Sequence, residues 1–316
     1  MVSFYYKAFN KIIQSSDLKL MNNLGYEDII WIDLNDPFGK EKRAVEAYLN
    51  TDLQTRAMAE EIESSSRYFE TEHIIYANTN FLISQGDGYH NEPLSFILTE
   101  GILVTVRNTD LRTLNDIGRK LLTTHKTYPT GYHLLVTILE TRIDLDADLI
   151  EGVAKEITQL SKQVSLGEKV DEEMLFYLNQ LQENIMSIRE NVIDKQRVLS
   201  SIMKSDLFPS DVYSKVNVML KDVNSLINHT NFGFERLDYL QETIIGLINI
   251  EQNKIIKIFT IVSVIFMPPT LIASIYGMNF TIPEFNWGVP GYFWALGLMV
   301  ISIAFILLYF KKKKFF

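Results

Sequence analysis

Two long uncharged stretches near the carboxyl end constrain the fold of this chain more than any other feature. They cover residues 258–276 and 292–310 and contain no Asp, Glu, Lys or Arg. Each is about 19 residues long, or roughly 28 Å as an α-helix, which matches the hydrocarbon thickness of a bilayer. The sequence therefore predicts two transmembrane helices joined by a short loop at residues 277–291.

Lysines flank both predicted spans on the same side. Lys254 and Lys257 precede the first span, and the tail at 311–316 begins with Lys311, Lys312, Lys313 and Lys314. Basic residues favour the cytoplasmic side of a membrane, so we expect cytoplasmic termini and an outward-facing loop. The first residues lack the apolar core of a signal peptide, which agrees with that orientation. Around an axis, the same lysines would also form a basic collar opposing cation passage.

The rest of the chain is strongly acidic. The whole sequence carries 30 Lys and Arg against 39 Asp and Glu, and the residues before Ile255 hold 25 and 38 of these. Nucleic-acid binding requires a basic footprint, so this balance argues against it and favours cations as partners. The chain has no cysteine, which excludes disulfides, thiolate metal sites and cysteine nucleophiles.

Strand-like and helical patterns divide the acidic part. Residues 1–125 contain apolar runs at 28–34, 73–84 and 95–106, the last turning at Glu100-Gly101, and predict an α/β domain. Residues 126–208 predict an antiparallel hairpin of helices at 132–164 and 170–204.

A stalk helix is expected at 209–257 and continues into the first span. From 211 to 276 it would be about 100 Å long, unless Gly233 or Gly246 interrupts it. The expected fold is therefore an α+β membrane protein with an α/β domain, a helical hairpin, a stalk and two C-terminal spans.

Polar and small residues recur along one face of the first span. At steps of three and four the stripe comprises Asn253, Ile256, Thr260, Ser263, Met267, Thr270 and Ser274. Pro268 and Pro269 also deprive two carbonyls of their donors, and such carbonyls must face protein or a wet cavity. Both features also occur in ordinary helix packing. Because two helices cannot enclose water, a pore would require several copies around an axis.

The first span ends in Tyr276-Gly277-Met278-Asn279. Gly277 permits a turn that presents main-chain carbonyls, and Asn279 adds an amide oxygen. A ring of neutral oxygens suits Mg²⁺, which gives up its waters reluctantly.

The hairpin is rich in carboxylates, and two interpretations of them are possible. They either form a solvated face, or they concentrate or bind cations between subunits. These residues are Glu140, Asp144, Asp146, Asp148, Glu151, Glu156, Glu168, Asp171, Glu172 and Glu173.

An enzyme is the weakest hypothesis. The chain shows no phosphate-binding glycine loop, and its histidines have no catalytic or metal-ligand spacing; they are His73, His90, His125, His133 and His229. The serious rival to a channel is a membrane-tethered interaction or sensor protein that uses the stripe only for packing.

These motifs resemble the CorA family of magnesium transporters, especially its enterobacterial type. The resemblance rests on Phe266-Met267-Pro268-Pro269-Thr270, the Gly277-Met278-Asn279 tripeptide and the lysine tail, with further similarity at 61–69 and 246–253. It implies a homopentameric funnel in the inner membrane that passes Mg²⁺, Co²⁺ and often Ni²⁺, without a covalent cofactor.

The resemblance also implies roles for particular residues. Gly277, Met278 and Asn279 would form the selectivity filter, Asn253 would lie near the cytoplasmic mouth, and Met267 and Thr270 would line the conduit. Intracellular Mg²⁺ bound between protomers would hold the pore closed, with Asp211 as a candidate ligand.

The outer loop departs from the family pattern. It reads Ile282-Pro283-Glu284-Phe285 where the family usually has Met-Pro-Glu-Leu. Glu284 is the sole acid of this loop and is expected to attract cations. A zinc-transporting branch usually replaces the methionine of the tripeptide with isoleucine, so Met278 argues against a Zn²⁺ transporter.

Overall fold

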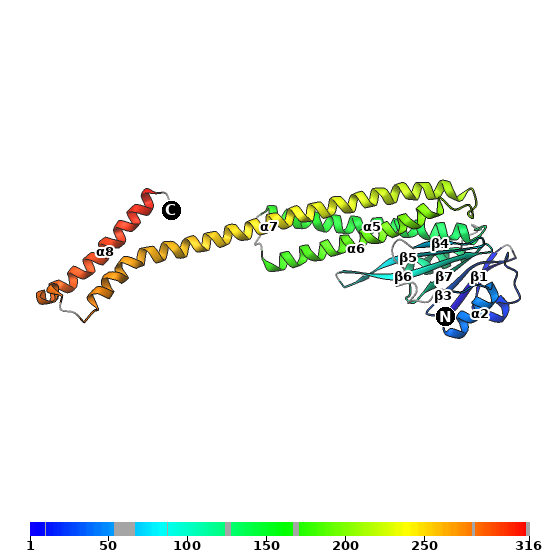
Figure 1. Ribbon diagram of the computed structural model, residues 1–316, viewed down its shortest axis with the longest axis horizontal. Helices are drawn as coiled ribbons and strands as arrows, with labels where there is room; N and C mark the ends of the chain where they lie inside the picture. The colour runs from blue at the N-terminus through cyan, green and yellow to red at the C-terminus, as the bar shows by residue number, and fades with distance from the viewer. Residues whose placement is uncertain are drawn as a thin grey trace. The chain divides into compact units, whose positions relative to one another are not determined.

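The computed structural model describes residues 1–9, 11–53, 67–86, 88–123, 128–166, 171–279 and 282–313. The chain divides into two compact units, Met1–Gln241 and Glu242–Phe316. Its elements (Figure 1) are β1 Val2–Ala8, β2 Lys11–Ser15, α1 Leu18–Met21, β3 Ile29–Asn35, α2 Gly39–Leu49, β4 Tyr68–Glu70, β5 Ile74–Gln85, β6 Gly88–Thr99, β7 Ile102–Arg107, α4 Arg112–Thr123, α5 Gly131–Ser165, α6 Glu172–Ile202, α7 Val212–Tyr276, η2 Pro283–Trp287 and α8 Val289–Lys312. His125, Glu168, Lys314 and residues 61–66, which the sequence singled out, lie outside the described residues.

A seven-stranded mixed sheet forms the centre of the first unit, with strand order β2-β1-β3-β7-β6-β5-β4. Its neighbouring strands are antiparallel, except that β3 and β7 run parallel. Glu100 and Gly101 join β6 to β7 with φ angles of 48° and 81°, so the predicted turn at this dipeptide is confirmed. The apolar runs at 28–34 and 73–84 correspond to β3 and β5.

Helices cover both faces of this sheet. Ile32 and Leu34 of β3 share a buried apolar cluster with Val45 of α2. The alternate residue Trp31 faces α4, where a Cβ at Gly118 would lie 3.6 Å from its ring. Helices α5 and α6 contact the same sheet through β3, β5, β6 and β7 (Figure 1). The predicted α/β domain is therefore confirmed.

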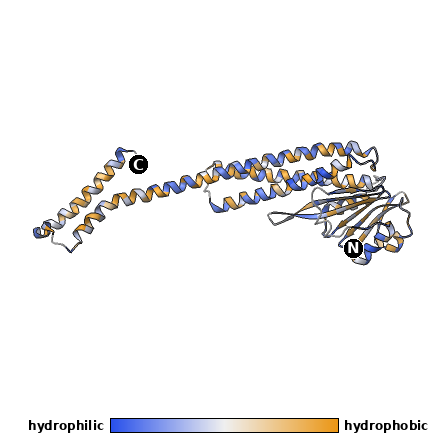
Figure 2. Ribbon diagram, in the orientation of Figure 1, coloured by the Kyte–Doolittle hydropathy of each residue, from blue (hydrophilic) through white to orange (hydrophobic). Residues whose placement is uncertain are grey.

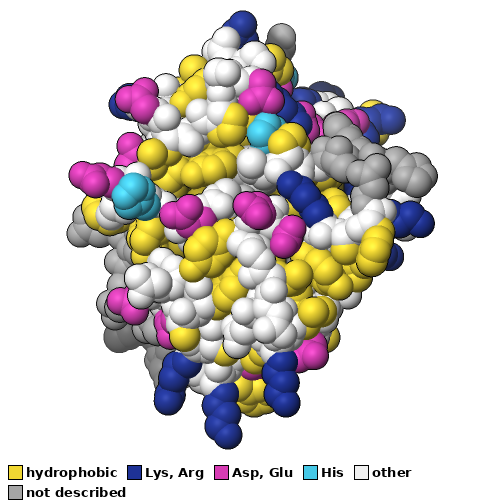
Figure 3. Space-filling model, turned by 90° about the vertical axis from the view of Figure 1, so that its right-hand side faces the viewer, with side chains coloured by type: hydrophobic (Ala, Val, Ile, Leu, Met, Phe, Trp, Pro, Cys, Tyr) yellow, Lys and Arg dark blue, Asp and Glu magenta, His cyan; other side chains and the backbone are white. Residues whose placement is uncertain are grey.

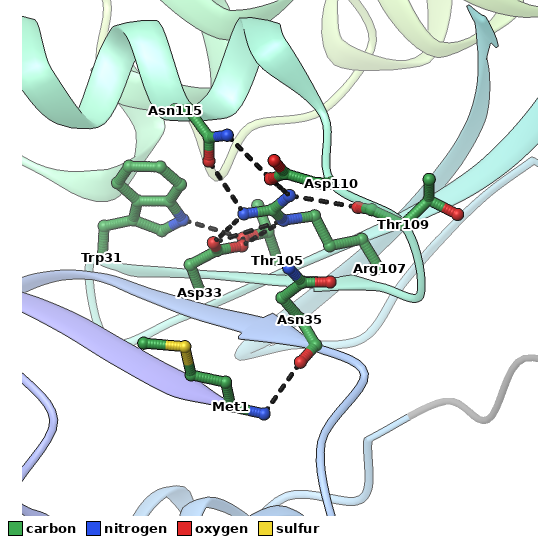
Figure 4. Close-up of polar contacts among 9 residues, drawn as sticks. All are labelled: Met1, Trp31, Asp33, Asn35, Thr105, Arg107, Thr109, Asp110 and Asn115. Atoms are coloured by element: carbon green, nitrogen blue, oxygen red, sulfur yellow. Dashed lines mark hydrogen bonds and ion pairs between the residues drawn. The ribbon is translucent and has the colours of Figure 1, made fainter.

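A buried ionic network fixes the carboxyl ends of the parallel strands (Figure 4). Arg107 Nη2 donates to Asp33 Oδ2 at 2.8 Å and to Asn115 Oδ1 of α4 at 3.1 Å. Thr105 Oγ1 donates to Asp33 Oδ1 at 2.6 Å and accepts from Trp31 Nε1 at 2.9 Å. Because each charge has several partners, the network holds β3, β7 and α4 together.

The first unit also contains the predicted pair of long helices. Helices α5 and α6 contact each other, and α7 begins at Val212. A Cβ added at Gly233 of α7 would lie 2.3 Å from Ile185 Cδ1 of α6. Gly233 therefore allows α7 to approach α6 closely and does not end the helix. Gly246 also lies inside α7, so the alternative that a glycine interrupts this helix is wrong.

Asp146 corrects one expectation about the hairpin carboxylates. It has no exposed surface, and its Oδ1 accepts from Arg142 Nε at 2.9 Å. Lys195 Nζ of α6 lies 2.8 Å from Asp146 Oδ2. Asp146 is thus part of a buried ionic contact. It neither belongs to a solvated face nor is free to bind cations between subunits, so both interpretations are wrong for this residue.

The second unit comprises the carboxyl-terminal part of α7, the short helix η2 and α8. Two helices of the described chain, α7 and α8, are long and apolar enough to cross a membrane. Their apolar windows are 0% and 6% buried within the protomer, so these surfaces must meet lipid or other protein. Figure 2 shows the hydrophobic colour running along both segments. The prediction of two C-terminal apolar helices is confirmed.

Figure 3 shows the sheet end of the first unit. Acidic and basic side chains are interspersed there with hydrophobic and uncharged ones, without a broad basic patch on the described part of this face.

Candidate functional site

All seven residues of the predicted stripe lie on α7, and every one is exposed in the protomer. They are Asn253, Ile256, Thr260, Ser263, Met267, Thr270 and Ser274. Successive members are three or four residues apart in one α-helix, so they share a face. This face is open to water or to another copy of the chain.

Two hydroxyl groups of the stripe donate back to their own helix. Thr260 Oγ1 donates to the Ile256 carbonyl at 2.8 Å, and Thr270 Oγ1 donates to the Phe266 carbonyl at 2.8 Å. A hydroxyl has one proton and two lone pairs, so both oxygens remain available as acceptors. The water molecules around a metal ion present their protons outward. The stripe thus offers groups suited to a hydrated cation.

The two prolines lie inside α7 and do not end it. Proline has no N–H, so Pro268 and Pro269 cannot donate to the carbonyls of Val264 and Ile265. Val264 and Ile265 are half-buried within the protomer. Two main-chain acceptors therefore lack their usual helical donors, one turn before the prolines.

The tripeptide follows the last residue of α7 directly. Gly277 N donates to the Ala273 carbonyl at 2.9 Å, and Met278 N donates to the Ile275 carbonyl at 3.2 Å, which tightens the final turn. Gly277 does not adopt a positive φ. Its need for glycine is spatial, since a Cβ would lie 3.1 Å from the Ala273 oxygen. Asn279 is exposed and makes no hydrogen bond to a described residue.

Glu284 lies in η2 and is only partly exposed. Its Oε2 atom is buried and has no hydrogen-bond partner among the described residues. The residue lines a cavity of about 410 Å³ between the end of α7 and the start of α8. The acid expected to attract cations from outside therefore directs one carboxylate oxygen into the protein.

Asp211, the candidate regulatory ligand, already has a partner within the protomer. Its Oδ2 lies 3.0 Å from His133 Nε2, and His133 Nδ1 lies 2.9 Å from Thr130 Oγ1. The hydrogen bond from His133 holds the pKa of Asp211 below its usual value. A metal ion would have to compete with this contact.

Three other carboxylates of α5 and α7 act on Asp144. Asp144 has a raised pKa because of partial burial and the nearby charges of Glu140, Asp222 and Asp148. Glu140 is also paired with Lys215 at 2.5 Å. Mutual repulsion of this kind favours a bound cation.

Among the residues that the structure describes, no group of three His, Asp or Glu side chains is close enough to hold a metal ion. Among the described histidines, His133 pairs with Asp211.

The lysines of the expected basic collar lie at the expected ends of the spans. Lys254 and Lys257 are exposed on α7, Lys311 and Lys312 end α8, and Lys313 follows it.

Sequence reasoning missed the buried role of Arg142, Asp146 and Lys195. The signal was present, because Asp146 replaces an apolar residue in the buried series Leu139, Ile143, Ile150 and Val153 of α5. A carboxylate within an apolar helical face predicts a buried partner.

Comparison with known proteins identifies the family. Residues 26–312 match the family described as CorA-like Mg²⁺ transporter protein. A magnesium transport protein CorA of Wolinella succinogenes is 39% identical over 99% of both chains. That of Salmonella typhimurium is 34% identical over 90% of this chain and 92% of its own.

The fold is also similar to that of a solved structure. The complete structure of the CorA magnesium transporter from Methanocaldococcus jannaschii is similar, with a TM-score of 0.79 and 19% identity over 98% of this chain and 97% of the other. The family match covers most of the sequence, and both apolar helices and the tripeptide lie within it. This chain therefore belongs to the CorA-like Mg²⁺ transporter family.

Proposed function

We propose that this chain forms a passive channel for Mg²⁺ uptake. The observation that carries the proposal is the exposed stripe of α7, which runs along an apolar helix and ends at the Gly277-Met278-Asn279 tripeptide. A polar face on a membrane helix is costly against lipid and favourable against water. In an oligomer with α7 innermost, the stripe would line the conduit.

The ion would pass with its hydration shell. Asn279 and main-chain carbonyls would form an outer ring of acceptors, and Thr270 and Thr260 would add hydroxyl oxygens below it. Neutral acceptors bind coordinated water without removing it, which avoids the large cost of dehydrating Mg²⁺. No nucleotide motif is present, so the membrane potential would drive entry by about 4.6 kcal/mol per divalent ion at 100 mV.

The assembly would be a homopentamer in the inner membrane. We propose cytoplasmic termini and an outer tripeptide loop, from the lysines that flank both spans. The relatives named as magnesium transport proteins support Mg²⁺ as the substrate. Co²⁺ and Ni²⁺, which have similar hydrated sizes, would also pass.

Intracellular Mg²⁺ would close the channel by binding acids of the first unit between protomers. The mutual repulsion around Asp144 supports this role better than Asp211 does, because Asp211 pairs with His133. Loss of Mg²⁺ would restore the repulsion and favour rearrangement of the subunits.

The test is influx of Mg²⁺ into dye-loaded liposomes that contain the purified full-length protein. Asn279→Ala should abolish most influx while the oligomer stays assembled, and the control Asn286→Ala in η2 should leave influx unchanged. Equal influx from wild type and Asn279→Ala would remove Asn279 from the filter. Absence of influx from an assembled wild type would favour a membrane-tethered interaction or sensor protein. Influx of Zn²⁺ alone would favour a zinc transporter.

A further inference from the structure

Another cavity lies in the first unit, between the β5–β6 hairpin and the helices α5 and α6. The hairpin runs beside α6 (Figure 1). The volume of the cavity is about 630 Å³, which is typical of small-molecule sites. Gly88 begins β6 here, and a Cβ at this position would lie 3.2 Å from Gln180 Nε2 of α6. Strand and helix therefore pack closely where they line the cavity.

One carboxylate of the lining is open to solvent. Glu156 of α5 is exposed, and its Oε2 accepts from the Tyr177 hydroxyl of α6 at 2.9 Å. Its negative charge also acts on Tyr89 of β6, whose pKa is raised by burial and by this charge. A carboxylate has about four lone-pair sites, and the bond from Tyr177 uses one of them. Glu156 can therefore accept further hydrogen bonds from a ligand in the cavity.

Aromatic rings form another part of the wall. Phe176 and Tyr177 of α6 are 64% and 42% exposed, and Tyr89 is half-buried. All three residues line the cavity. A ligand that covers exposed aromatic surface removes it from water, which is favourable. The faces of aromatic rings also attract cations.

The lining restricts the chemistry of a ligand. Glu156 is the only charged residue among those described around the cavity, so no basic side chain there could bind a phosphate or carboxylate. A bare divalent ion prefers six or more oxygen ligands, and a single carboxylate beside aromatic rings does not provide them. Glu156 also lies about 18 Å along α5 from Asp144, so this cavity is separate from the acids proposed for regulation.

We infer that this cavity binds a small organic cation, an ammonium group on a short apolar chain, with Glu156 as its counter-ion. The chain would cover the rings of Phe176 and Tyr177. A free alkylamine and a lysine side chain of a second copy share this chemistry. One protomer supplies every wall of the cavity, so we assign it to the free amine. The inference goes beyond magnesium transport and does not depend on ion conduction.

Binding of butylamine to the purified full-length protein tests the inference. Ligand-detected NMR titration at pH 7.5, where an alkylamine is charged, measures the affinity, and 1-butanol offers the same chain without the charge. Wild type should bind butylamine about tenfold more tightly than 1-butanol, the ratio expected for one charge-assisted hydrogen bond. Glu156→Gln keeps the size of the side chain and should lose this preference. The control Glu190→Gln, an exposed acid of α6 outside the lining, should keep it.

A second variant tests the aromatic wall. Phe176→Ala should weaken butylamine binding about two- to fivefold, as expected for one exposed cation–π contact. Phe176 is mostly exposed, so this variant should fold normally and decides the outcome if Glu156→Gln does not fold.

Three results would overturn the inference. The first is equal affinity of wild type for butylamine and 1-butanol, and the second is unchanged butylamine affinity in both Glu156→Gln and Phe176→Ala. The third is a weaker oligomer in Glu156→Gln when wild type binds no butylamine, which would assign the carboxylate to a lysine of a second copy. Each result leaves the Mg²⁺ influx of wild type as a separate question.

Discussion

Lys195 Nζ on α6 lies 2.8 Å from Asp146 Oδ2 on α5, and neither side chain has any exposed surface. Arg142 shares the same carboxylate, and the Phe81 ring of β5 lies 5.2 Å from its guanidinium carbon. Lys195 also donates to the Asn80 carbonyl of β5 at 3.3 Å. The contact thus joins both long helices to the sheet.

Removing Asp146 should destabilise the first unit strongly. Asp146→Ala leaves two buried cations without their carboxylate, which typically costs about 3–5 kcal/mol. Urea unfolding of the purified full-length protein, followed by circular dichroism, measures the change. The control Glu151→Gln, an exposed acid on the same helix, should change the urea midpoint very little. Similar midpoints for the two variants would contradict the structural role of Asp146.

Lys195 should make stability rise with pH. Burial lowers its pKa in the folded state to about 8, below the usual value near 10.5. Between these two values the unfolded chain binds more protons than the folded chain, so the free energy of unfolding increases as pH rises. Melting temperatures from pH 7.5 to 9.0 keep most tyrosines of the unfolded chain protonated, because their usual pKa is about 10. The increase should be absent in Lys195→Met, and a wild-type melting temperature that falls over this range would contradict the prediction.

Two glycines in long helices should respond oppositely to alanine. A Cβ at Gly233 would collide with Ile185, whereas a Cβ at Gly152 of α5 would meet no atom within 4 Å. Gly152→Ala should stabilise the first unit by about 1 kcal/mol through helix propensity alone. Gly233→Ala gains the same propensity and loses about 1–3 kcal/mol to overpacking, so its net effect should be destabilising. The urea midpoints of the two variants show whether each substitution stabilises or destabilises the protein. Stabilisation by both would show that Ile185 of α6 moves aside at little cost.

Local signals predicted much of this fold, and long-range pairing could not be read from them. The turn at Glu100-Gly101 follows from turn chemistry between two apolar runs. The parallel pairing of Ile32 with Val104 joins distant segments, and strand pattern alone allows other sheet orders. For the candidate site, periodicity placed the stripe on one helix, because i, i+3 and i+4 positions are set locally. The inward carboxylate of Glu284 depends on packing at Gly291, which spacing does not reveal.

Mg²⁺ should stabilise the assembled protein through the acids around Asp144. Partial burial and the charges of Glu140, Asp222 and Asp148 raise the pKa of Asp144. These neighbours therefore make the negative charge of Asp144 unfavourable. Asp144→Asn should raise the melting temperature slightly without Mg²⁺ and reduce the increase produced by millimolar Mg²⁺. Differential scanning fluorimetry with Mg²⁺ or chelator measures both effects, with Asp238→Asn as a control of equal charge change. Identical Mg²⁺ shifts in wild type and Asp144→Asn would remove this cluster from regulation.

The hydroxyl of Thr270 should matter to conduction as an acceptor. Its proton is committed to the Phe266 carbonyl at 2.8 Å, so only its lone pairs can meet the waters of a passing ion in the proposed pore. Thr270→Val keeps the shape and removes the oxygen, and a total loss of about 1.4 kcal/mol of ion binding around the ring would lower Mg²⁺ influx about tenfold. Thr270→Ser keeps the oxygen and should retain most of the influx, whereas a purely steric role would predict that the isosteric Thr270→Val resembles wild type. Liposome influx at equal protein content compares the three proteins. Influx in Thr270→Val equal to that of wild type would show that the ion does not bind at this level of α7.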